Sequence, residues 1–304
     1  MRYSSPMLAL RSHRAIPAYL LCTLCLSSLF YLLIALSSTG GGEWADYTGC
    51  LMWCPAAGAL LACRYLGRSI STIAWQWGRT RYQVAGYLIP LGYASLIYGF
   101  VWTTGFGGFY NRRFVDLAAK DFGFGPLPHG ATIALYFFFT ATIAVIKDSA
   151  TVLGEEIGWR GFLVPELAKR HGFVATSLIS GIIWALWHYP ILLLGSYHSP
   201  TPVWYYLPMF TVTVTAINFL WTWLRLKSGS IWPCVVLHAA HNTFIQRFFD
   251  PLTVFNNKTS YISTEFGAAL TAVSILIAVY LSSRRNEVEQ SPLRPDSVSA
   301  TASD

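Results

Sequence analysis

Charged residues are scarce in this sequence. Only 12% of its 304 residues are Asp, Glu, Lys or Arg, whereas 54% are apolar and 16% are aromatic. Soluble domains carry about 25% charged residues, so this composition argues against a protein surrounded by water on all sides. The mean hydropathy of +0.45 indicates a membrane protein instead.

A continuous basic patch is also missing, although the net charge is +7. The Lys and Arg residues lie in short segments between hydrophobic windows, and this distribution excludes nucleic acid as a partner. Such short basic segments are typical of topology signals in membrane proteins. Membrane lipids are therefore the first expected partner.

The six cysteines do not form a pattern of the kind that disulfide-rich proteins show, because they lie almost entirely inside hydrophobic windows. A free cysteine in such a window behaves as a small apolar residue. We interpret Cys22-x-x-Cys25 as packing, since no second ligand pair accompanies it as a redox or metal site requires.

Long apolar windows dominate the chain, and each is about the length that a helix needs to cross the hydrocarbon core. They predict an all-α polytopic transmembrane helix bundle of about eight spans with an intramembrane active-site cavity. The windows are 15–38, 48–65, 82–104, a fourth from about residue 130, 173–195, 203–224, 231–249 and 266–281. We expect a loop at 105–129 and a disordered tail at 284–304.

The basic segments predict the orientation of these spans. With eight spans, the N-terminal arginines and most of the later Lys and Arg residues fall on one side. Basic loops favour the cytoplasmic side, so we predict a multi-pass integral membrane protein with both termini in the cytoplasm, in the cell membrane if the source is bacterial.

One charged cluster interrupts the apolar pattern at 154–163, where the chain reads GEEIGWRGFL. Ionisable groups are costly at membrane depth, so three of them within six residues indicate a functional site. Glu156 and Arg160 are four residues apart and share a helix face, which predicts an ion pair. Glu155 points about 100° away and has no such partner in sequence. We therefore predict Glu155 as the working carboxylate and the pair as its support.

Three further polar side chains lie within later windows. His188 follows an aromatic helix turn, and His238 and Asn242 are four residues apart on one helix face. Counted from the cytoplasmic ends at ~1.5 Å per residue, all three lie well below the membrane surface. Glu155 can reach them only on a helix sunk within the protein. We expect that helix to follow a break around Lys147-Asp148 and to emerge near residues 166–169.

These residue types suit activation of a water molecule for amide hydrolysis. Glu155 is the candidate base, and His188 can share that work or hold the water. His238 and Asn242 can donate hydrogen bonds to a developing oxyanion. A divalent metal such as zinc, bound by Glu155, His188 and His238, is an alternative that stays open. The chain has no His-Glu-x-x-His motif, so the zincin pattern is absent.

The ordered set of Glu155-Glu156-x-x-x-Arg160, His188 and His238-x-x-x-Asn242 resembles the CAAX-protease and bacteriocin-processing family of intramembrane proteases, which includes the Ras-converting CaaX endopeptidases. The resemblance covers roughly residues 130–249. It implies an endopeptidase in which Glu155 and His188 activate the water, His238 and Asn242 stabilise the oxyanion, and Glu156 and Arg160 shape the site. It also implies a hydrophobic or lipidated peptide substrate, with CaaX-type processing among the activities of the family.

This resemblance divides the chain into N-terminal helices and a loop (1–129), a catalytic core (130–249), a last helix (250–283) and the tail (284–304). Two other functions remain open. Buried Glu and His residues also serve proton or cation relays in transporters, although no internal repeat is evident. A non-catalytic relative that binds membrane peptides is the other alternative, and the presence of every motif residue argues against it.

Overall fold

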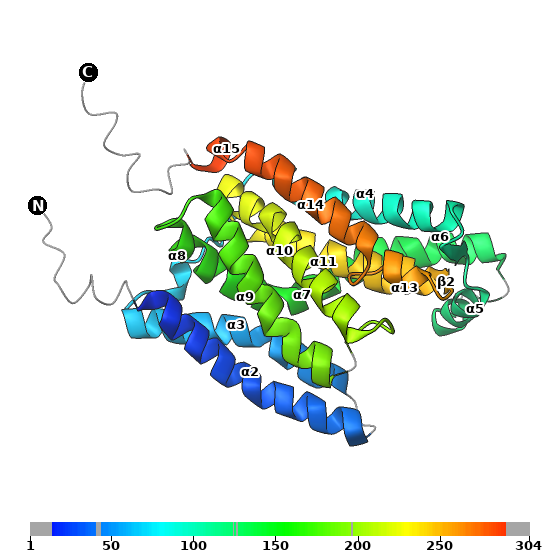
Figure 1. The fold of residues 1–304 in the computed structure, drawn as a ribbon, viewed down its shortest axis with the longest axis horizontal. Coiled ribbons are helices and arrows are strands. Elements are labelled where there is room, and N and C mark those ends of the chain that lie inside the picture. The colour runs from blue at the N-terminus through cyan, green and yellow to red at the C-terminus, as the bar shows by residue number, and fades with distance from the viewer. Residues whose placement is uncertain (1–13, 41–43, 124, 126, 196, 290–304) are drawn as a thin grey trace, which may run out of the picture.

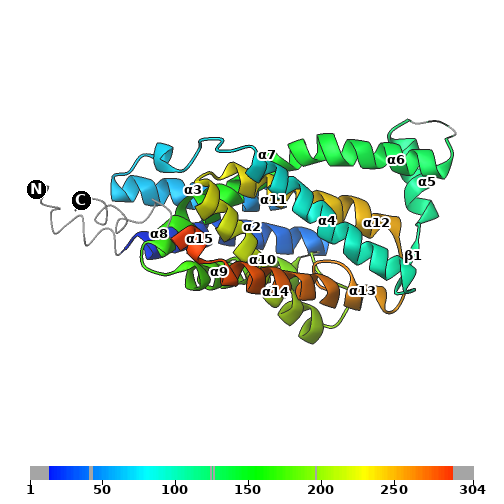
Figure 2. The ribbon, with the colours of Figure 1, turned by 90° about the horizontal axis from the view of Figure 1, so that it is seen from above.

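The protein is a helix bundle in the computed structural model, which describes residues 14–40, 44–123, 125, 127–195 and 197–289. The long helices run along one axis, with α8 and α15 at one end and α5, α13 and two short strands at the other (Figure 1, Figure 2). The strands β1 (Gly107–Phe109) and β2 (Thr253–Phe255) pair antiparallel, with Gly108 opposite Val254. The predicted all-α class is confirmed.

The helical elements follow the predicted windows closely. The α-helices are α2 (Ala15–Gly40), α3 (Trp44–Leu66), α4 (Arg81–Thr103), α5 (Arg112–Asp121), α6 (His129–Phe139), α7 (Val145–Glu156), α8 (Val164–Ala168), α9 (Phe173–Leu194), α10 (Val203–Ser228), α11 (Trp232–Asn242), α12 (Asp250–Leu252), α13 (Thr259–Ile262), α14 (Ala268–Ser283) and α15 (Asn286–Glu289). A 3₁₀ turn, η1 (Ile70–Thr72), and three π-helical segments, η2 (Thr140–Ala144), η3 (Ile157–Leu163) and η4 (Thr243–Phe249), complete them.

Six helical segments in the described part of the chain are long and apolar enough to cross a membrane. They are Ala15–Ser37, Tyr47–Leu66, Arg81–Thr103, His129–Ala168, Phe173–Leu194 and Val203–Ser228. The other two predicted windows are also helical: 231–249 forms α11 and η4, and the last window forms α14, which is apolar but shorter. The bundle is thus polytopic, and the expected count of eight is an approximation.

The predicted break at Lys147-Asp148 is wrong, because α7 runs through both residues without interruption. Asp148 is buried against Arg247, whose Nε and Nη2 donate to its two oxygens at 2.7 and 2.9 Å. Thr243 donates a third hydrogen bond at 2.9 Å. Lys147 is exposed. A paired carboxylate and an outward lysine give the helix no reason to break, and the irregularity lies earlier, in η2.

Two segments expected to lack helices contain them. The predicted loop at 105–129 holds β1 and the ten-residue helix α5, which begins where Asn111 Oδ1 accepts a hydrogen bond from the Phe114 backbone N–H. The predicted disordered tail begins with α15, where the buried Val288 packs against the core. Residues 290–304 of that tail lie outside the described residues.

Close helix contacts place α7 between α3 and α11, and η3 continues along α3. Glycines allow the approach to α3. A Cβ added at Gly154 would lie 2.6 Å from the Met52 carbonyl oxygen, and one added at Gly158 would lie 2.6 Å from the Pro55 carbonyl oxygen. Small residues let membrane helices approach at this distance. The glycines that flank the glutamates thus set the position of the charged cluster.

Gly158→Ala is expected to lower the free energy of unfolding by about 1–3 kcal/mol, because the new methyl group overpacks against rigid backbone. The measurement is thermal unfolding of the purified protein in detergent. Gly92→Ala in α4 is the matched control, since nothing lies within 4 Å of its added Cβ. Alanine is favoured over glycine in a helix by about 1 kcal/mol, so the control should be neutral or stabilising. Equal effects of the two substitutions would contradict this packing argument.

Candidate active site

A cavity of about 210 Å³ lies inside the bundle, and four of the predicted site residues line it: Glu155 from α7, His188 from α9, and His238 and Asn242 from α11. These helices are far apart in the sequence, and the fold brings the four side chains to one space. The other two predicted residues, Glu156 and Arg160, are not among its lining. They lie behind the wall of the cavity, where both side chains are fully buried.

Glu155 is 2% exposed and reaches the cavity from the end of α7. Its Oε2 accepts hydrogen bonds from the indole N–H of Trp184 at 2.7 Å and of Trp159 at 3.3 Å. Oε1 of the same carboxylate has no protein donor among the described residues. This second oxygen is therefore available to a water molecule or a substrate.

Glu156 forms the predicted pair with Arg160, since Arg160 Nη1 lies 3.0 Å from Glu156 Oε1. The same oxygen is 2.8 Å from His238 Nδ1. Because Arg160 donates to this oxygen, it acts as an acceptor, and His238 Nδ1 carries the hydrogen. Glu156 therefore links the arginine to a histidine of the cavity and fixes the orientation of that imidazole ring.

Arg160 is bound through both of its terminal nitrogens, whereas its Nε is buried without a hydrogen-bond partner among the described residues. Its Nη2 donates to Asn218 Oδ1 at 2.7 Å, and its Cζ lies 4.1 Å from the centroid of the Trp184 ring. Asn218 in turn donates to the Ser177 carbonyl and the Ser180 hydroxyl, both at 2.8 Å. The guanidinium is thus positioned by residues of α9 and α10, and both of these helices lie far from Arg160 in the sequence. Asn218 was not predicted, although a lone amide in an apolar window is a signal.

His188 is half-buried and faces the cavity beside aromatic rings. Its Nδ1 lies 2.8 Å from the Trp184 carbonyl oxygen, which can only accept a hydrogen bond. Nδ1 therefore carries the hydrogen, and in the neutral ring Nε2 is a free acceptor. Asn242 is also half-buried, and no hydrogen bond of its side chain is found among the described residues.

Another histidine–glutamate pair, His241 and Glu265, lines the cavity with both of its side chains. His241 Nε2 lies 3.0 Å from Glu265 Oε1, which also accepts from Gln246 at 2.9 Å. Tyr93 contacts the other ring nitrogen of His241, and Tyr197 donates to Glu265 Oε2. Neither His241 nor Glu265 is among the predicted site residues, and Glu265 was not predicted because it lies at the edge of the last apolar window.

The alternative of a metal bound by Glu155, His188 and His238 has no support in this arrangement. Across the described residues, no three side chains of His, Cys, Asp or Glu are grouped so that they could hold one ion. His238 also directs Nδ1 to Glu156, so only its Nε2 could act as a ligand. The described residues at this position therefore do not fit a three-ligand metal site.

Comparison with known proteins bears on the same part of the chain. Residues 129–244 match the family model of the type II CAAX prenyl endopeptidases, Rce1-like. The family resemblance is confirmed over this segment. All six predicted site residues of the CAAX-protease pattern fall within it, whereas Glu265 falls outside.

A curated relative supports the same assignment. The chain is 26% identical over 164 residues to CAAX prenyl protease 2 of Methanococcus maripaludis, a match that spans 49% of this chain and 58% of the relative. The family match and the six apolar helical segments together identify the chain as a multi-pass integral membrane protein. The match with CAAX prenyl protease 2 spans less than two thirds of the relative's own length.

Proposed function

We propose that this protein is an intramembrane endopeptidase that hydrolyses a peptide bond with an activated water molecule. One observation carries the proposal: Glu155, His188, His238 and Asn242, from three separate helices, line a single buried cavity within the segment that matches the CAAX prenyl endopeptidases. A purely structural role for each residue would not require all four to face one space.

In the proposed reaction, the free oxygen of Glu155 and Nε2 of His188 hold the water. Glu155 takes a proton from it as the oxygen attacks the peptide carbonyl carbon. The same proton then passes to the amide nitrogen, the C–N bond breaks, and an acid and an amine leave. Trp184 assists both residues, because its indole N–H binds Glu155 and its carbonyl orients His188.

The oxyanion that forms on the carbonyl oxygen needs donors, which His238 and Asn242 provide in this proposal. His238 directs its Nδ1 hydrogen to Glu156. Donation from Nε2 therefore requires a second proton on the ring, and Glu156 is the counter-ion for the resulting imidazolium. The Asn242 amide supplies the second donor. Glu156 and Arg160 act as positioning residues, since neither lines the cavity.

The cavity also limits the substrate. Its wall includes apolar side chains such as Leu51, Ile191 and Phe210, and its volume of about 210 Å³ suits a peptide bond with its nearest side chains rather than a folded domain. The matching family, the type II CAAX prenyl endopeptidases, and the relative, CAAX prenyl protease 2, are both named as prenyl proteases. We therefore propose a hydrophobic or lipidated peptide within the membrane as substrate, with CaaX-type C-terminal processing as the form to test first.

His188→Ala is expected to cause uncleaved substrate to accumulate, because the catalytic water loses its hydrogen bond to His188 Nε2. Mass spectrometry of membrane peptides from cells that express the wild type or the variant measures this. The rate of substrate turnover in this variant should be lower than in the wild type by at least about 10²-fold. His198→Ala is the matched control, since His198 is an exposed histidine outside the cavity. Unchanged peptides in His188→Ala, together with proton flux in proteoliposomes that depends on Glu155, would favour a transporter instead.

A further inference from the structure

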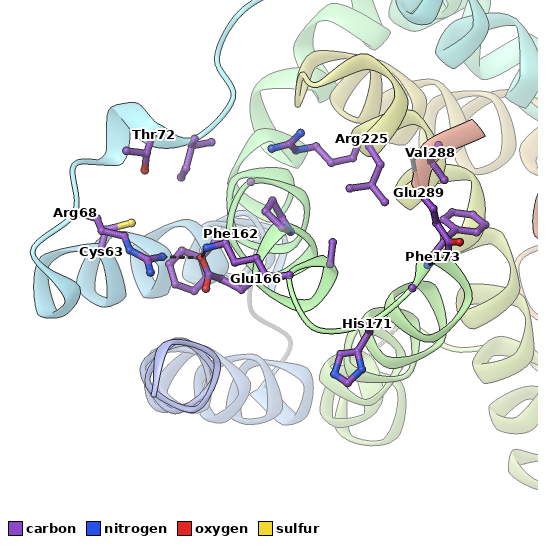
Figure 3. Close-up of a pocket in the computed structure, with 17 residues that line it drawn as sticks. Cys63, Arg68, Thr72, Phe162, Glu166, His171, Phe173, Arg225, Val288 and Glu289 are labelled. Carbon is purple, nitrogen blue, oxygen red and sulfur yellow. Dashed lines mark hydrogen bonds and ion pairs between the residues drawn. The ribbon is translucent and has the colours of Figure 1, made fainter. Parts of the chain in front are cut away.

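A second, larger cavity of about 350 Å³ lies beside α8, at the end of the helical segment that carries Glu155, where α3, α8, α10 and α15 meet. Its polar lining includes five charged side chains: Arg68, Glu166, Lys169, Arg225 and Glu289. Figure 3 shows four of them, together with His171. Apolar side chains, among them Phe162 and Phe173, form the rest of the wall. The cavity is therefore amphiphilic, and it is separate from the lining of the candidate active site.

The two acidic residues of this cavity already have partners. Glu166 Oε1 accepts from Arg68 Nη1 at 2.6 Å and also from Lys169. Glu289 Oε1 accepts the backbone N–H of Phe173 at 2.8 Å and so caps the start of α9. Neither carboxylate contacts the remaining basic residue of the lining, Arg225.

Arg225 is 4% exposed, and its Nε donates to the Arg160 carbonyl oxygen at 2.9 Å. Its Nη1 is buried with no hydrogen-bond partner, and no ion pair of this guanidinium is found among the described residues. A buried charge without an ionic partner is costly, so a guanidinium in this position at a cavity is suited to pair with an anion. Figure 3 shows Arg225 extending from α10 across the cavity toward Thr72.

The charges of the lining indicate which anion fits. Arg68, Lys169 and Arg225 contribute three positive charges, and Glu166 and Glu289 contribute two negative ones, which leaves one positive charge. A phosphodiester carries one negative charge, and the planar guanidinium fork matches phosphate oxygens. The apolar wall can contact acyl chains. The position also fits, since Arg68, Lys169 and Arg225 lie at helix ends, where lipid headgroups meet a membrane protein.

We propose that this cavity is a binding site for a phosphate group, with Arg225 as its central donor and an anionic phospholipid headgroup as its source. The bound phosphate neutralises Arg225 and thereby steadies the hydrogen bond to the Arg160 carbonyl in η3. This inference does not rest on the proposed peptidase activity, and it is tested by binding alone.

The test uses the full-length protein, delipidated in detergent, and compares dioleoylphosphatidylglycerol, dioleoylglycerol and inorganic phosphate. The first two share their acyl chains and differ in the phosphate headgroup. We expect phosphatidylglycerol to raise the unfolding temperature by a few degrees and to remain bound in native mass spectrometry, while dioleoylglycerol has no effect. An equal shift with inorganic phosphate would support the phosphate site and assign its source to the solution.

Three variants locate the site. Arg225→Gln and Lys169→Gln should lose most of the shift, and Lys169→Gln decides the matter if Arg225→Gln does not fold. Arg64→Gln is the matched control, because Arg64 is an exposed arginine on the last turn of α3 that does not line the cavity. It should keep the full shift. The proposal is overturned if dioleoylglycerol stabilises as well as phosphatidylglycerol, or if Arg64→Gln loses as much as the two cavity variants.

Discussion

Glu155→Gln is expected to lower the rate of peptide-bond hydrolysis by about 10²- to 10⁴-fold, the range that a general base contributes. The amide keeps an oxygen that can accept the hydrogen bond from Trp184, so the position of the side chain is preserved. The amide cannot take a proton from water. The loss should therefore appear in kcat, measured with a quenched fluorescent prenylated peptide and the purified protein in proteoliposomes.

Asp148→Asn is the matched control for this substitution. Asp148 is another buried carboxylate of α7, but it binds Arg247 and Thr243 and does not line the cavity. Its replacement should lower the unfolding temperature and leave kcat close to the wild-type value. Near-wild-type turnover by Glu155→Gln would remove Glu155 from the role of base, and an equal loss of kcat in both variants would indicate a general effect of buried charge.

The apolar windows predicted the helices well because membrane helices must satisfy their backbone hydrogen bonds internally, whatever their neighbours are. The errors arose where a distant partner decides the outcome. Asp148 stays within a regular helix because Arg247, 99 residues later, neutralises it. Local sequence gives no sign of that pairing. The helix α5 was missed because the Gly and Pro residues around it were read as a continuous loop.

The candidate site shows the same division between local and distant information. The Glu156–Arg160 pair follows from helical spacing and was predicted. The partners on other helices were not predicted: Trp184 donates to Glu155, and Asn218 accepts from Arg160. Both residues lie far from the charged cluster in the sequence, and aromatic residues have many roles in a membrane protein. Glu265 was missed for a related reason: a carboxylate at the edge of a span is usually an exposed residue.

Arg160→Leu is expected to lower the free energy of unfolding by about 3–5 kcal/mol, because it leaves the buried carboxylate of Glu156 without its main counter-charge. Both side chains are fully buried, so water cannot compensate for the loss. The substitution also removes the donor to Asn218. Equilibrium unfolding in mixed micelles with increasing denaturing detergent measures the change.

Adding Glu156→Gln to Arg160→Leu should recover part of this stability, since the double variant no longer contains an unpaired buried carboxylate. A double variant that is no more stable than Arg160→Leu would show that lost packing against Trp184, rather than charge, dominates the cost. The double variant also separates the effect of the pair on stability from its effect on hydrolysis. Even with stability partly recovered, hydrolysis should stay low, because His238 has lost the carboxylate that fixes its ring and that balances its imidazolium in the proposed mechanism.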